Sequence, residues 1–307
     1  MLHPKYIMWS LCALVHCDWV FKLHIFITGI RGQLGTALAK RWPAAQVSGC
    51  DLPECDISQL QPTLDAVAAA RPQVVIHCAA WTDVDGCARD PLRAHQINAI
   101  GTQHVALAAR AVCARLLLLS SNEVFDGVQP APYGELDTPC PANPYGWSKL
   151  AAEWTAQHIV EDCCVVRSSW LFGHGGRNFV HRILELARSA APLRVVTDET
   201  GAPTAVEDLA DAIFSLIESR QRGIFHLVNS GFASRYELAR AVLDLCGHSA
   251  TKIEPALLAG FPRASTPPRN GCLRNSAAAA IGIKLRPWQD ALPEFIGSLQ
   301  SAGSAVR

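Results

Sequence analysis

The sequence predicts an α/β fold: a Rossmann-like, doubly wound parallel sheet followed by a smaller, partly discontinuous C-terminal region. A continuous apolar run at 23–28 enters a glycine-rich turn and then a helix-forming segment. Strand-like and helix-like segments then alternate to about residue 168, which is typical of a parallel sheet with right-handed crossovers. Beyond that point the alternation loosens, and glycine, proline and arginine become frequent.

These observations divide the chain into three parts. We expect a poorly ordered extension at 1–22, a dinucleotide-binding domain at 23–168, and a mainly substrate-binding region at 169–307 with some segments returning to the sheet. The apolar run at 6–15 is too short to span a membrane comfortably, and no small-residue cleavage site follows it. A signal or anchor is the alternative for the extension.

Composition describes a globular protein with a substantial core, because 50% of the 307 residues are hydrophobic and 18% are charged. Lys+Arg and Asp+Glu balance at 27 each, so nothing in the net charge indicates nucleic acid or a membrane surface as a partner. The 12 cysteines are scattered without a CxxC pair. We therefore expect buried reduced thiols in a cytoplasmic protein, and no structural metal site.

The glycine-rich turn follows the first strand directly. Glycines permit a tight turn and let backbone N–H groups approach a pyrophosphate, which rests at the N-terminus of the next helix. The spacing is a weak signal alone, but the order strand, glycines, helix at 36–41 strengthens it. The turn residues predicted to bind a dinucleotide are Gly29, Arg31, Gly32, Gln33, Leu34 and Gly35.

A second strand, 46–50, ends at Asp51, which stands at the distance expected of a ribose-binding carboxylate. Leu52 occupies the place where a basic residue would favour a 2′-phosphate, and this favours NADH. Arg31 in the turn could still hold NADPH, so both cofactors stay open.

The alternation continues with a helix at 59–70, a strand at 74–78, a helix at 91–112 and a strand at 116–119. Ligands of parallel sheets bind at the carboxyl ends of the strands. Ala79, Ala80 and Trp81 follow one of these ends and Ser121 follows another, so small residues there would let a cofactor lie across the sheet edge. His77, inside its strand, is expected to be a hydrogen-bonded core residue.

Tyr145 and Lys149 follow the Asn143–Pro144 break and are four residues apart, so they should share one face of a helix. A phenol with a pKa near ~10 is a poor proton-transfer group at neutral pH unless a cation stabilises its phenolate. Lys149 supplies that cation. Taken alone, the pair could equally be a surface tyrosine and lysine on an ordinary helix.

With Ser121, these two residues complete a Ser/Tyr/Lys set beside a dinucleotide site, and here the chain resembles the extended short-chain dehydrogenase/reductase family. The likeness covers about residues 23–295 and is greatest to members that reduce dTDP-linked 4-keto-6-deoxy sugars. It rests on the segments AAWTDVD (79–85), SSNEVFDG (120–127), NPYG (143–146), VRSSWLF (166–172) and GAPT (201–204).

The resemblance implies a role for each member of the set. The cofactor would deliver hydride to a sugar C4 ketone, Tyr145 would protonate the resulting alkoxide, and Ser121 would hydrogen-bond the carbonyl oxygen. Lys149 would lower the tyrosine pKa and hold the nicotinamide ribose. The resemblance further places Asp56 and Ile57 near the adenine and Asn98 behind the catalytic helix.

One departure from the family pattern bears on the substrate. The reductases usually carry Thr-Asp-Tyr where this chain has Ser121-Asn122-Glu123. Serine keeps the hydroxyl, whereas Glu123 replaces an aromatic residue and resembles the Asp-Glu acid/base pair of nucleotide-sugar 4,6-dehydratases. Asn122 cannot act as the acid of such a pair. A 4-epimerase or 4,6-dehydratase, and a non-catalytic dinucleotide-binding regulatory subunit, are the alternative functions.

The C-terminal region is expected to contact a nucleotide-sugar substrate. The resemblance implies contacts by Asn122, Glu123, Trp170, Asn178 and Arg269, with Arg274 in a similar segment. Strands are predicted at 193–196 and 224–228, helices from the loop at 173–179 to about 189 and at 206–218, 235–246 and 277–280, and a Pro/Arg-rich loop outside the core at 261–271. A homodimer and a Mg²⁺ requirement stay open.

Overall fold

A six-stranded parallel sheet forms the centre of the computed structural model, which describes residues 23–188 and 192–304. The order β10-β5-β4-β3-β1-β2 confirms the predicted doubly wound, Rossmann-like arrangement. Its strands are β1 (Ile25–Thr28), β2 (Val47–Cys50), β3 (Val74–His77), β4 (Arg115–Ser121), β5 (Cys163–Ser168) and β10 (Gly223–His226). The extension predicted at 1–22 lies outside the described residues.

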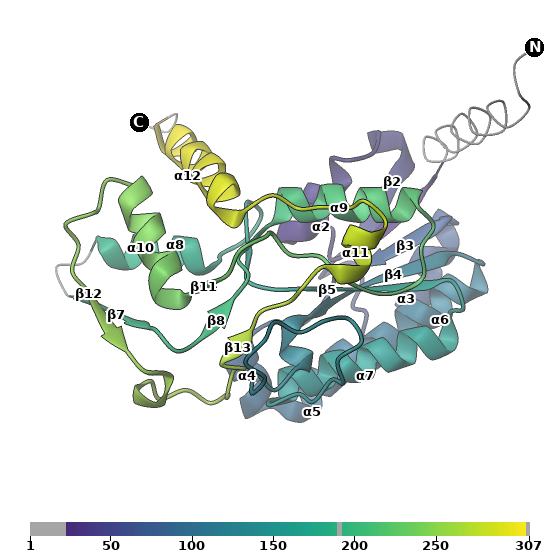
Figure 1. Ribbon diagram of the computed structural model, residues 1–307. Helices are drawn as coiled ribbons and strands as arrows, with labels where there is room; N and C mark the ends of the chain where they lie inside the picture. Colours follow the sequence, from purple (N-terminus) through teal and green to yellow (C-terminus); the bar gives the residue numbers. More distant parts are fainter. Residues whose placement is uncertain (1–22, 189–191, 305–307) are drawn as a thin grey trace, which may run out of the picture.

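Helices cover both faces of this sheet (Figure 1). Helices α2 (Gln33–Ala39) and α9 (Val206–Glu218) lie on one face, and α3 (Leu60–Ala70), α6 (Gly101–Ala111) and α7 (Pro144–Ile159) lie on the other. Successive strand residues point to opposite faces, so Ile25 and Ile27 of β1 pack under α2 and α9 while Phe26 packs on the other side.

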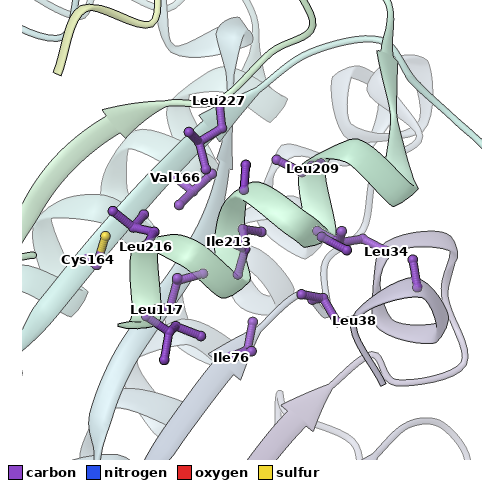
Figure 2. Packing of buried hydrophobic residues seen from close by; sticks show 14 of the residues in the cluster. Leu34, Leu38, Ile76, Leu117, Cys164, Val166, Leu209, Ile213, Leu216 and Leu227 are labelled. Atoms are coloured by element: carbon purple, nitrogen blue, oxygen red, sulfur yellow. The ribbon is translucent and has the colours of Figure 1, made fainter. Parts of the chain in front are cut away.

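Helix α9 shows how a segment from the C-terminal half completes the N-terminal sheet. In Figure 2, Leu209, Ile213 and Leu216 of α9 lie over the strand residues Leu117 and Val166. All five side chains are buried. Together with the edge strand β10, α9 returns to the sheet as expected of some segments beyond residue 168, while the boundary at 168/169 stays a prediction.

The helix predicted at 91–112 is divided into three consecutive parts. Helix α5 (Pro91–Ala94) leads into a π-helical segment (His95–Ile100), which continues as α6. Such wide turns inside α-helices occur often at functional sites. The π-helical segment contains Asn98, whose side chain is buried behind α7.

The C-terminal half builds small sheets around its own core. The pairs are β6 (Leu171–Phe172) with β9 (Thr204–Ala205), β7 (Leu193–Val196) with β12 (Ile253–Ala256), and β8 (Thr200–Gly201) with both β11 (Ala233–Ser234) and β13 (Asn270–Gly271). Helices α8 (Phe179–Ala187), α10 (Arg235–Leu245) and α12 (Trp288–Ser304) enclose one hydrophobic cluster, and the short α11 (Ser276–Ala280) lies beside β10.

Helix α12 was not predicted, because Pro293 and Gly297 lie inside it and both disfavour a helix. Tertiary packing outweighs these local preferences, since Trp288, Leu292 and Phe295 are buried against α8 and α10. The helix boundary predicted at 36 was also late: α2 begins at Gln33, directly after the glycine turn.

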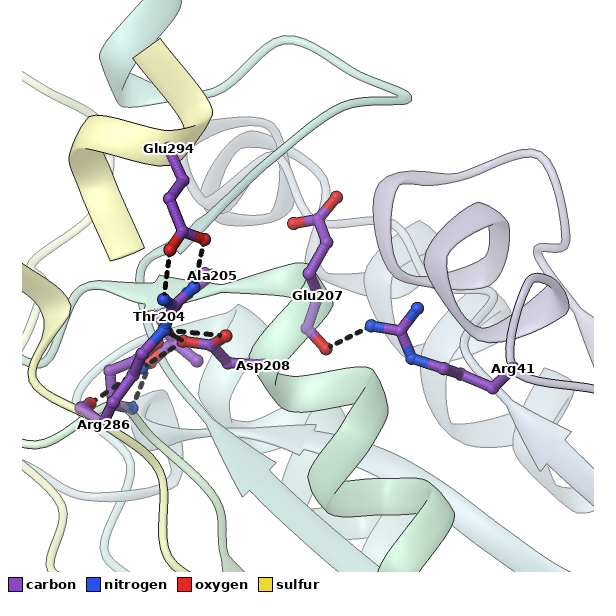
Figure 3. Close-up of polar contacts among 8 residues, drawn as sticks. Arg41, Thr204, Ala205, Glu207, Asp208, Arg286 and Glu294 are labelled. Atoms are coloured by element: carbon purple, nitrogen blue, oxygen red, sulfur yellow. Dashed lines mark hydrogen bonds and ion pairs between the residues drawn. The ribbon is translucent and has the colours of Figure 1, made fainter. Parts of the chain in front are cut away.

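A cluster of charged side chains, Asp208, Arg286 and Glu294, connects α12 to α9. Figure 3 shows Arg286 between Asp208 of α9 and Glu294 of α12, with bonds of 2.9 Å to Asp208 and 2.5 and 2.6 Å to Glu294. Asn229 donates to Asp208 at 2.7 Å and to the Arg286 carbonyl at 2.9 Å. The two carboxylates raise the pKa of Arg286, so its guanidinium stays charged.

The Pro/Arg-rich loop at 261–271 is more buried than predicted. Ser265 and the two prolines that follow Thr266 are buried, so the expectation of a loop outside the core is wrong for these residues. The cause is polar: the backbone N–H and the hydroxyl of Ser265 donate to Asp85, and the Thr266 carbonyl accepts from Asn143. These bonds fasten the loop to the N-terminal half.

An ion pair fixes α7 to the sheet from within. Glu153 of α7 and Arg167 of β5 are each 1% exposed, and Arg167 donates to the carboxylate at 2.9 and 2.7 Å. Ser120 donates to the same carboxylate at 2.5 Å, and the guanidinium lies 5.1 Å from the ring centre of Phe125. The carboxylate therefore has several hydrogen bonds to compensate for its burial.

We predict that Glu153→Ala lowers the free energy of unfolding by about 3–5 kcal/mol, because it leaves the buried Arg167 guanidinium without its counter-charge. Urea denaturation of the purified variant measures this. The matched control is Glu161→Ala, which breaks an exposed pair with Arg222 and should leave the unfolding midpoint unchanged. An equal loss of unfolding free energy in the two variants would contradict a larger contribution of the buried pair to stability.

Candidate active site

The glycine turn requires its glycines for steric reasons. Gly29 has a φ of +71°, and a Cβ atom on Gly35 would lie 2.2 Å from the Gly29 carbonyl oxygen. A Cβ atom on Gly29 would itself lie 2.9 Å from the Ala79 nitrogen at the end of β3. The first turn of α2 can therefore approach the strand ends closely, and the free N–H groups at its N-terminus suit an anion.

A cavity of about 700 Å³ opens along the carboxyl ends of the strands. Most of the predicted cofactor residues line it: Gly29, Gly32, Gln33, Leu34, Gly35, Asp51, Asp56, Ile57, Ala79, Ala80 and Trp81. Arg31, Asn98, Tyr145 and Lys149 do not line it, although Leu119, which accepts a hydrogen bond from Lys149, does. The structure thus brings together residues that lie as far apart in the sequence as the first and fourth strands.

Asp51 and Arg31 lie together at one end of this cavity. The Asp51 carboxylate accepts from the backbone N–H groups of Arg31 at 3.0 Å and of Leu52 at 2.9 Å. The guanidinium of Arg31 is held by Glu54 and by the Leu52 carbonyl, and this pairing lowers the pKa of Glu54. The arginine is exposed, so its contact with Glu54 can exchange for another anion.

A loop from the C-terminal half closes over the glycine turn, which the sequence analysis missed. Gly175, Gly176 and Arg177 line the cavity, and a Cβ atom on Gly176 would lie 2.8 Å from Cγ of Gln33. Asn178 caps α8 and donates to the Gln33 side chain at 2.9 Å. The prediction placed Asn178 with the substrate, whereas the structure joins it to the glycine turn. The glycines at 173, 175 and 176 were the available signal.

Ser121, Tyr145 and Lys149 meet where the first turns of α7 touch the end of β4. Asn143 caps α7 by accepting from the Gly146 N–H at 2.9 Å, and Pro144 occupies the first helical position. All three residues of the set are buried, and the Ser121 hydroxyl lies close enough to the Tyr145 phenol to lower its pKa.

The electrostatics of the set differ from the expectation. Burial raises the pKa of Tyr145 and the nearby Glu123 carboxyl raises it further, against a smaller lowering by the Ser121 hydrogen bond. Lys149 does not produce the expected lowering: its ammonium donates to the Leu119 carbonyl at 2.8 Å, and burial lowers its own pKa to about 8. Tyr145 is therefore a protonated donor at neutral pH.

Buried polar side chains support this arrangement from behind. Asn98 donates to Ser148 of α7 at 2.9 Å and exchanges two hydrogen bonds with the backbone of Trp81, at 2.8 and 3.1 Å. His77 contacts the hydroxyls of Thr28 at 2.6 Å and Thr102 at 3.0 Å. The prediction of a hydrogen-bonded core histidine is confirmed, and burial lowers the pKa of His77 to about 3.

Asn122 and Glu123 follow Ser121 in a short 3₁₀ turn. Asn122 is buried, and its amide leaves no room for a side chain at Gly271, where a Cβ atom would lie 2.4 Å from the amide nitrogen. Glu123 accepts from Asn143 at 2.6 Å. Burial raises the pKa of Glu123 to about 7, so the carboxyl group is partly protonated at neutral pH.

Trp170 is part of a packed cluster with two residues that the sequence analysis missed. Its φ is +46°, and the guanidinium of Arg235 lies 3.5 Å from the centre of its ring. Glu199 is buried and accepts from Arg235 at 3.0 and 2.8 Å. A Cβ atom on Gly201 would lie 2.5 Å from the indole. No local pattern marks these contacts, which join separate elements.

The remaining predicted substrate residue, Arg269, is exposed, and its carbonyl accepts from the Thr200 N–H at 2.8 Å. Within residues 23–188 and 192–304, no group of three or more His, Cys, Asp or Glu side chains could hold a metal ion. The cysteines described there are all unpaired, and Cys113 and Cys140 are exposed, contrary to the expectation of buried thiols. No helix among these residues is both long and apolar enough to cross a membrane.

The parallel sheet, the glycine turn and the buried Ser/Tyr/Lys set define an extended short-chain dehydrogenase/reductase. Comparison with known families narrows this class. The family described as the RmlD substrate binding domain matches residues 23–301, and the chain belongs to that family. The predicted resemblance is therefore confirmed.

Similar proteins have closely related names. The chain is 38% identical to dTDP-4-dehydrorhamnose reductase of Mycobacterium tuberculosis, over 92% of this chain and 95% of that protein. It is 34% identical to the spore coat polysaccharide biosynthesis protein SpsK of Bacillus subtilis, over 91% and 98%. The crystal structure of dTDP-4-dehydrorhamnose reductase from Bacillus anthracis in complex with NADP superposes with a TM-score of 0.86 at 32% identity, over 90% and 99%.

We predict that Glu123→Gln changes the pH dependence of stability. The folded-state pKa of Glu123, about 7, lies above the value of about 4.3 for an unfolded chain, so the wild type loses stability as the pH rises between these values. The glutamine side chain cannot ionise. The rise in Tm caused by the substitution should therefore be larger at about pH 8 than at about pH 5, as measured by thermal unfolding. A constant difference would contradict the raised pKa.

Proposed function

We propose that the protein is an NAD(P)H-dependent reductase of the C4 ketone in a dTDP-linked 4-keto-6-deoxy sugar, acting as a dTDP-4-dehydrorhamnose reductase in dTDP-L-rhamnose biosynthesis. The observation that carries this proposal is the burial of Tyr145 with Ser121 and Lys149 at the end of β4, beside the glycine-lined cavity. The names of the similar proteins support the same activity.

The cavity suits a nicotinamide dinucleotide, since Gly29 and Gly35, where a Cβ atom would meet backbone, let the first turn of α2 lie against the strand ends with its N–H groups available for a pyrophosphate. Asp51 would hold the adenosine ribose, Asp56 and Ile57 the adenine, and Lys149 the nicotinamide ribose. The strand-end residues from Ala79 to Trp81 would lie along the cofactor. When bound, the nicotinamide supplies the hydride for the carbonyl carbon.

Residues of this chain then bind and protonate the oxygen at C4. Ser121 hydrogen-bonds this oxygen and orients the carbonyl. Tyr145 donates its phenolic proton as negative charge develops there, and burial excludes water that would compete for the proton. Lys149, fixed to the Leu119 carbonyl, would act on the nicotinamide ribose rather than on the pKa of the phenol.

We assign the substrate contacts to the residues that the family resemblance marks. Asn122, Glu123 and Trp170 are proposed to contact the sugar, and Arg269, with an exposed guanidinium, to contact the diphosphate. Asn178 would act on the cofactor side, through Gln33.

The alternative functions fit these residues less well. A 4,6-dehydratase needs an acid where this chain has the Asn122 amide, which cannot donate a proton in that role. A regulatory subunit has no need of the complete Ser/Tyr/Lys set. Unpaired cysteines in the described parts of the chain agree with a reducing, cytoplasmic compartment.

The experiment that tests the function follows the loss of reduced nicotinamide absorbance with dTDP-4-keto-rhamnose generated in situ. Stoichiometric consumption with a dTDP-rhamnose product is the expected result. Conversion of the sugar without consumption would move the assignment to an epimerase or dehydratase, and no conversion would refute the proposed substrate.

Tyr145→Phe should lower kcat by about 10²–10⁴-fold while leaving the Kd for the cofactor unchanged, because only the proton donor is removed. Tyr133→Phe is the matched control: this second buried tyrosine donates to Asp126 at 2.7 Å, and its loss should leave kcat nearly intact. Full turnover by Tyr145→Phe would remove the phenol from the mechanism.

We further predict that Glu54 sets the balance between NADH and NADPH. Glu54→Ala frees the exposed Arg31 guanidinium for a 2′-phosphate, so the ratio of kcat/KM for NADPH over NADH should rise by roughly 5- to 20-fold, as expected for one charge-assisted hydrogen bond. Parallel kinetics with both cofactors measure the ratio. An unchanged ratio, together with an unchanged ratio in Arg31→Ala, would place the 2′-position elsewhere.

A further inference from the structure

Glu123 is a carboxyl group that the mechanism above leaves without a chemical task. Its position is fixed through Asn143, which donates to one carboxyl oxygen, Oε2, at 2.6 Å and to the Thr266 carbonyl at 3.1 Å. The same amide accepts from the Gly146 N–H at 2.9 Å and so caps α7. One side chain therefore holds the Glu123 carboxyl in register with the first turn of the helix that carries Tyr145.

The backbone brings Glu123 even closer to this turn. A Cβ atom on Gly146 would lie 2.0 Å from the Glu123 carbonyl oxygen, so the residue after Tyr145 is in direct contact with Glu123. The Glu123 N–H also donates to the Ser121 hydroxyl at 3.2 Å, and this hydroxyl lies close enough to the Tyr145 phenol to lower its pKa. Glu123 and Tyr145 therefore share two neighbours, Ser121 and Gly146.

No charged group in the described parts of the chain forms an ion pair with Glu123. Arg235 of α10 and Arg263 of the 261–271 loop lower its pKa, but Arg235 is bound to Glu199 and Arg263 to Asp85. Glu199, before β8, raises the pKa of Glu123, as burial does. The second carboxyl oxygen, Oε1, makes no hydrogen bond to any described residue and is the atom free to exchange a proton.

We propose that Glu123 is a second proton-transfer residue, which returns a proton to Tyr145 after each reduction. The inference rests on the proposed function. As the sugar alkoxide takes the phenolic proton, the Tyr145 O–H bond breaks and a phenolate forms. The O–H bond of the Glu123 carboxyl group then breaks and the phenol re-forms. The carboxylate recovers its proton from water, so the cycle closes without another reactant.

The direction of this transfer follows from the acidities. The Glu123 pKa of about 7 lies far below that of the buried phenol, so the proton moves downhill to the phenolate. A carboxyl group of ordinary acidity would be ionised at neutral pH and would have no proton to give. Burial without an ionic partner keeps the Glu123 carboxyl partly protonated at neutral pH.

The kinetic test compares the wild type with Glu123→Gln, whose amide oxygen still accepts from Asn143, and with Glu123→Asp, which keeps an acid. We expect Glu123→Gln to lower kcat by about 10- to 100-fold, with both KM values nearly unchanged and the inflection of kcat near neutral pH lost. Formate or imidazole in the buffer should restore part of kcat, and Glu123→Asp should retain the inflection. Unchanged kcat, or a raised KM alone, would overturn the proposal.

A second test needs no turnover. Ultraviolet difference titration of the holoenzyme against Tyr145→Phe isolates the ionisation of Tyr145, and the same difference is measured in the Glu123→Gln background. Removal of the carboxylate charge should shift tyrosinate formation to lower pH. An unchanged midpoint would show that the two groups do not interact and would refute the proposal. If the wild type does not reduce the sugar, the proposed function fails, while this titration still decides whether the pair exists.

Discussion

The site depends on the direct contact between α7 and the end of β4. Three residues of α7, each one helical turn from the next, face three consecutive residues of the strand: Tyr145 lies beside Ser121, Lys149 donates to the Leu119 carbonyl and Glu153 accepts from Ser120. Side chains four residues apart lie on one face of a helix, so a single docking event places all three. The buried pair with Arg167 then fixes the deepest of these contacts.

Each half of the chain supplies different parts of the site around this contact. The N-terminal half supplies the glycine turn, the strand ends and Tyr145, whereas the C-terminal half supplies the loop over Gln33 and the Trp170 cluster. Asn143 connects the two, because its one amide group binds the cap of α7, Glu123 and the loop carbonyl of Thr266. The geometry of the reacting groups and the position of the C-terminal loop are thereby coupled.

The parts that could be predicted are those specified by neighbouring residues. The strand–glycine–helix order and the Tyr145–Lys149 spacing are local, and both led to the correct elements. The cluster of Trp170, Glu199 and Arg235 joins distant segments, and no periodicity reveals such contacts. Helix α12 was missed because local preference at Pro293 opposes the packing that forms it. The raised pKa of Tyr145 depends on burial, which spacing alone does not measure.

The clustering of the proton chemistry on α7 and β4 has a consequence for how such a protein can be remodelled. Trp170 and Arg235, which stack on each other, belong to segments that supply neither Ser121 nor Tyr145. The segments that carry Trp170 and Arg235 can therefore change without replacing Ser121 or Tyr145, whereas a change at Thr266 would reach the cap of α7 through Asn143. The Ser/Tyr/Lys set and the Trp170 cluster thus lie on different segments of the chain, and the Asn143 side chain connects the two halves.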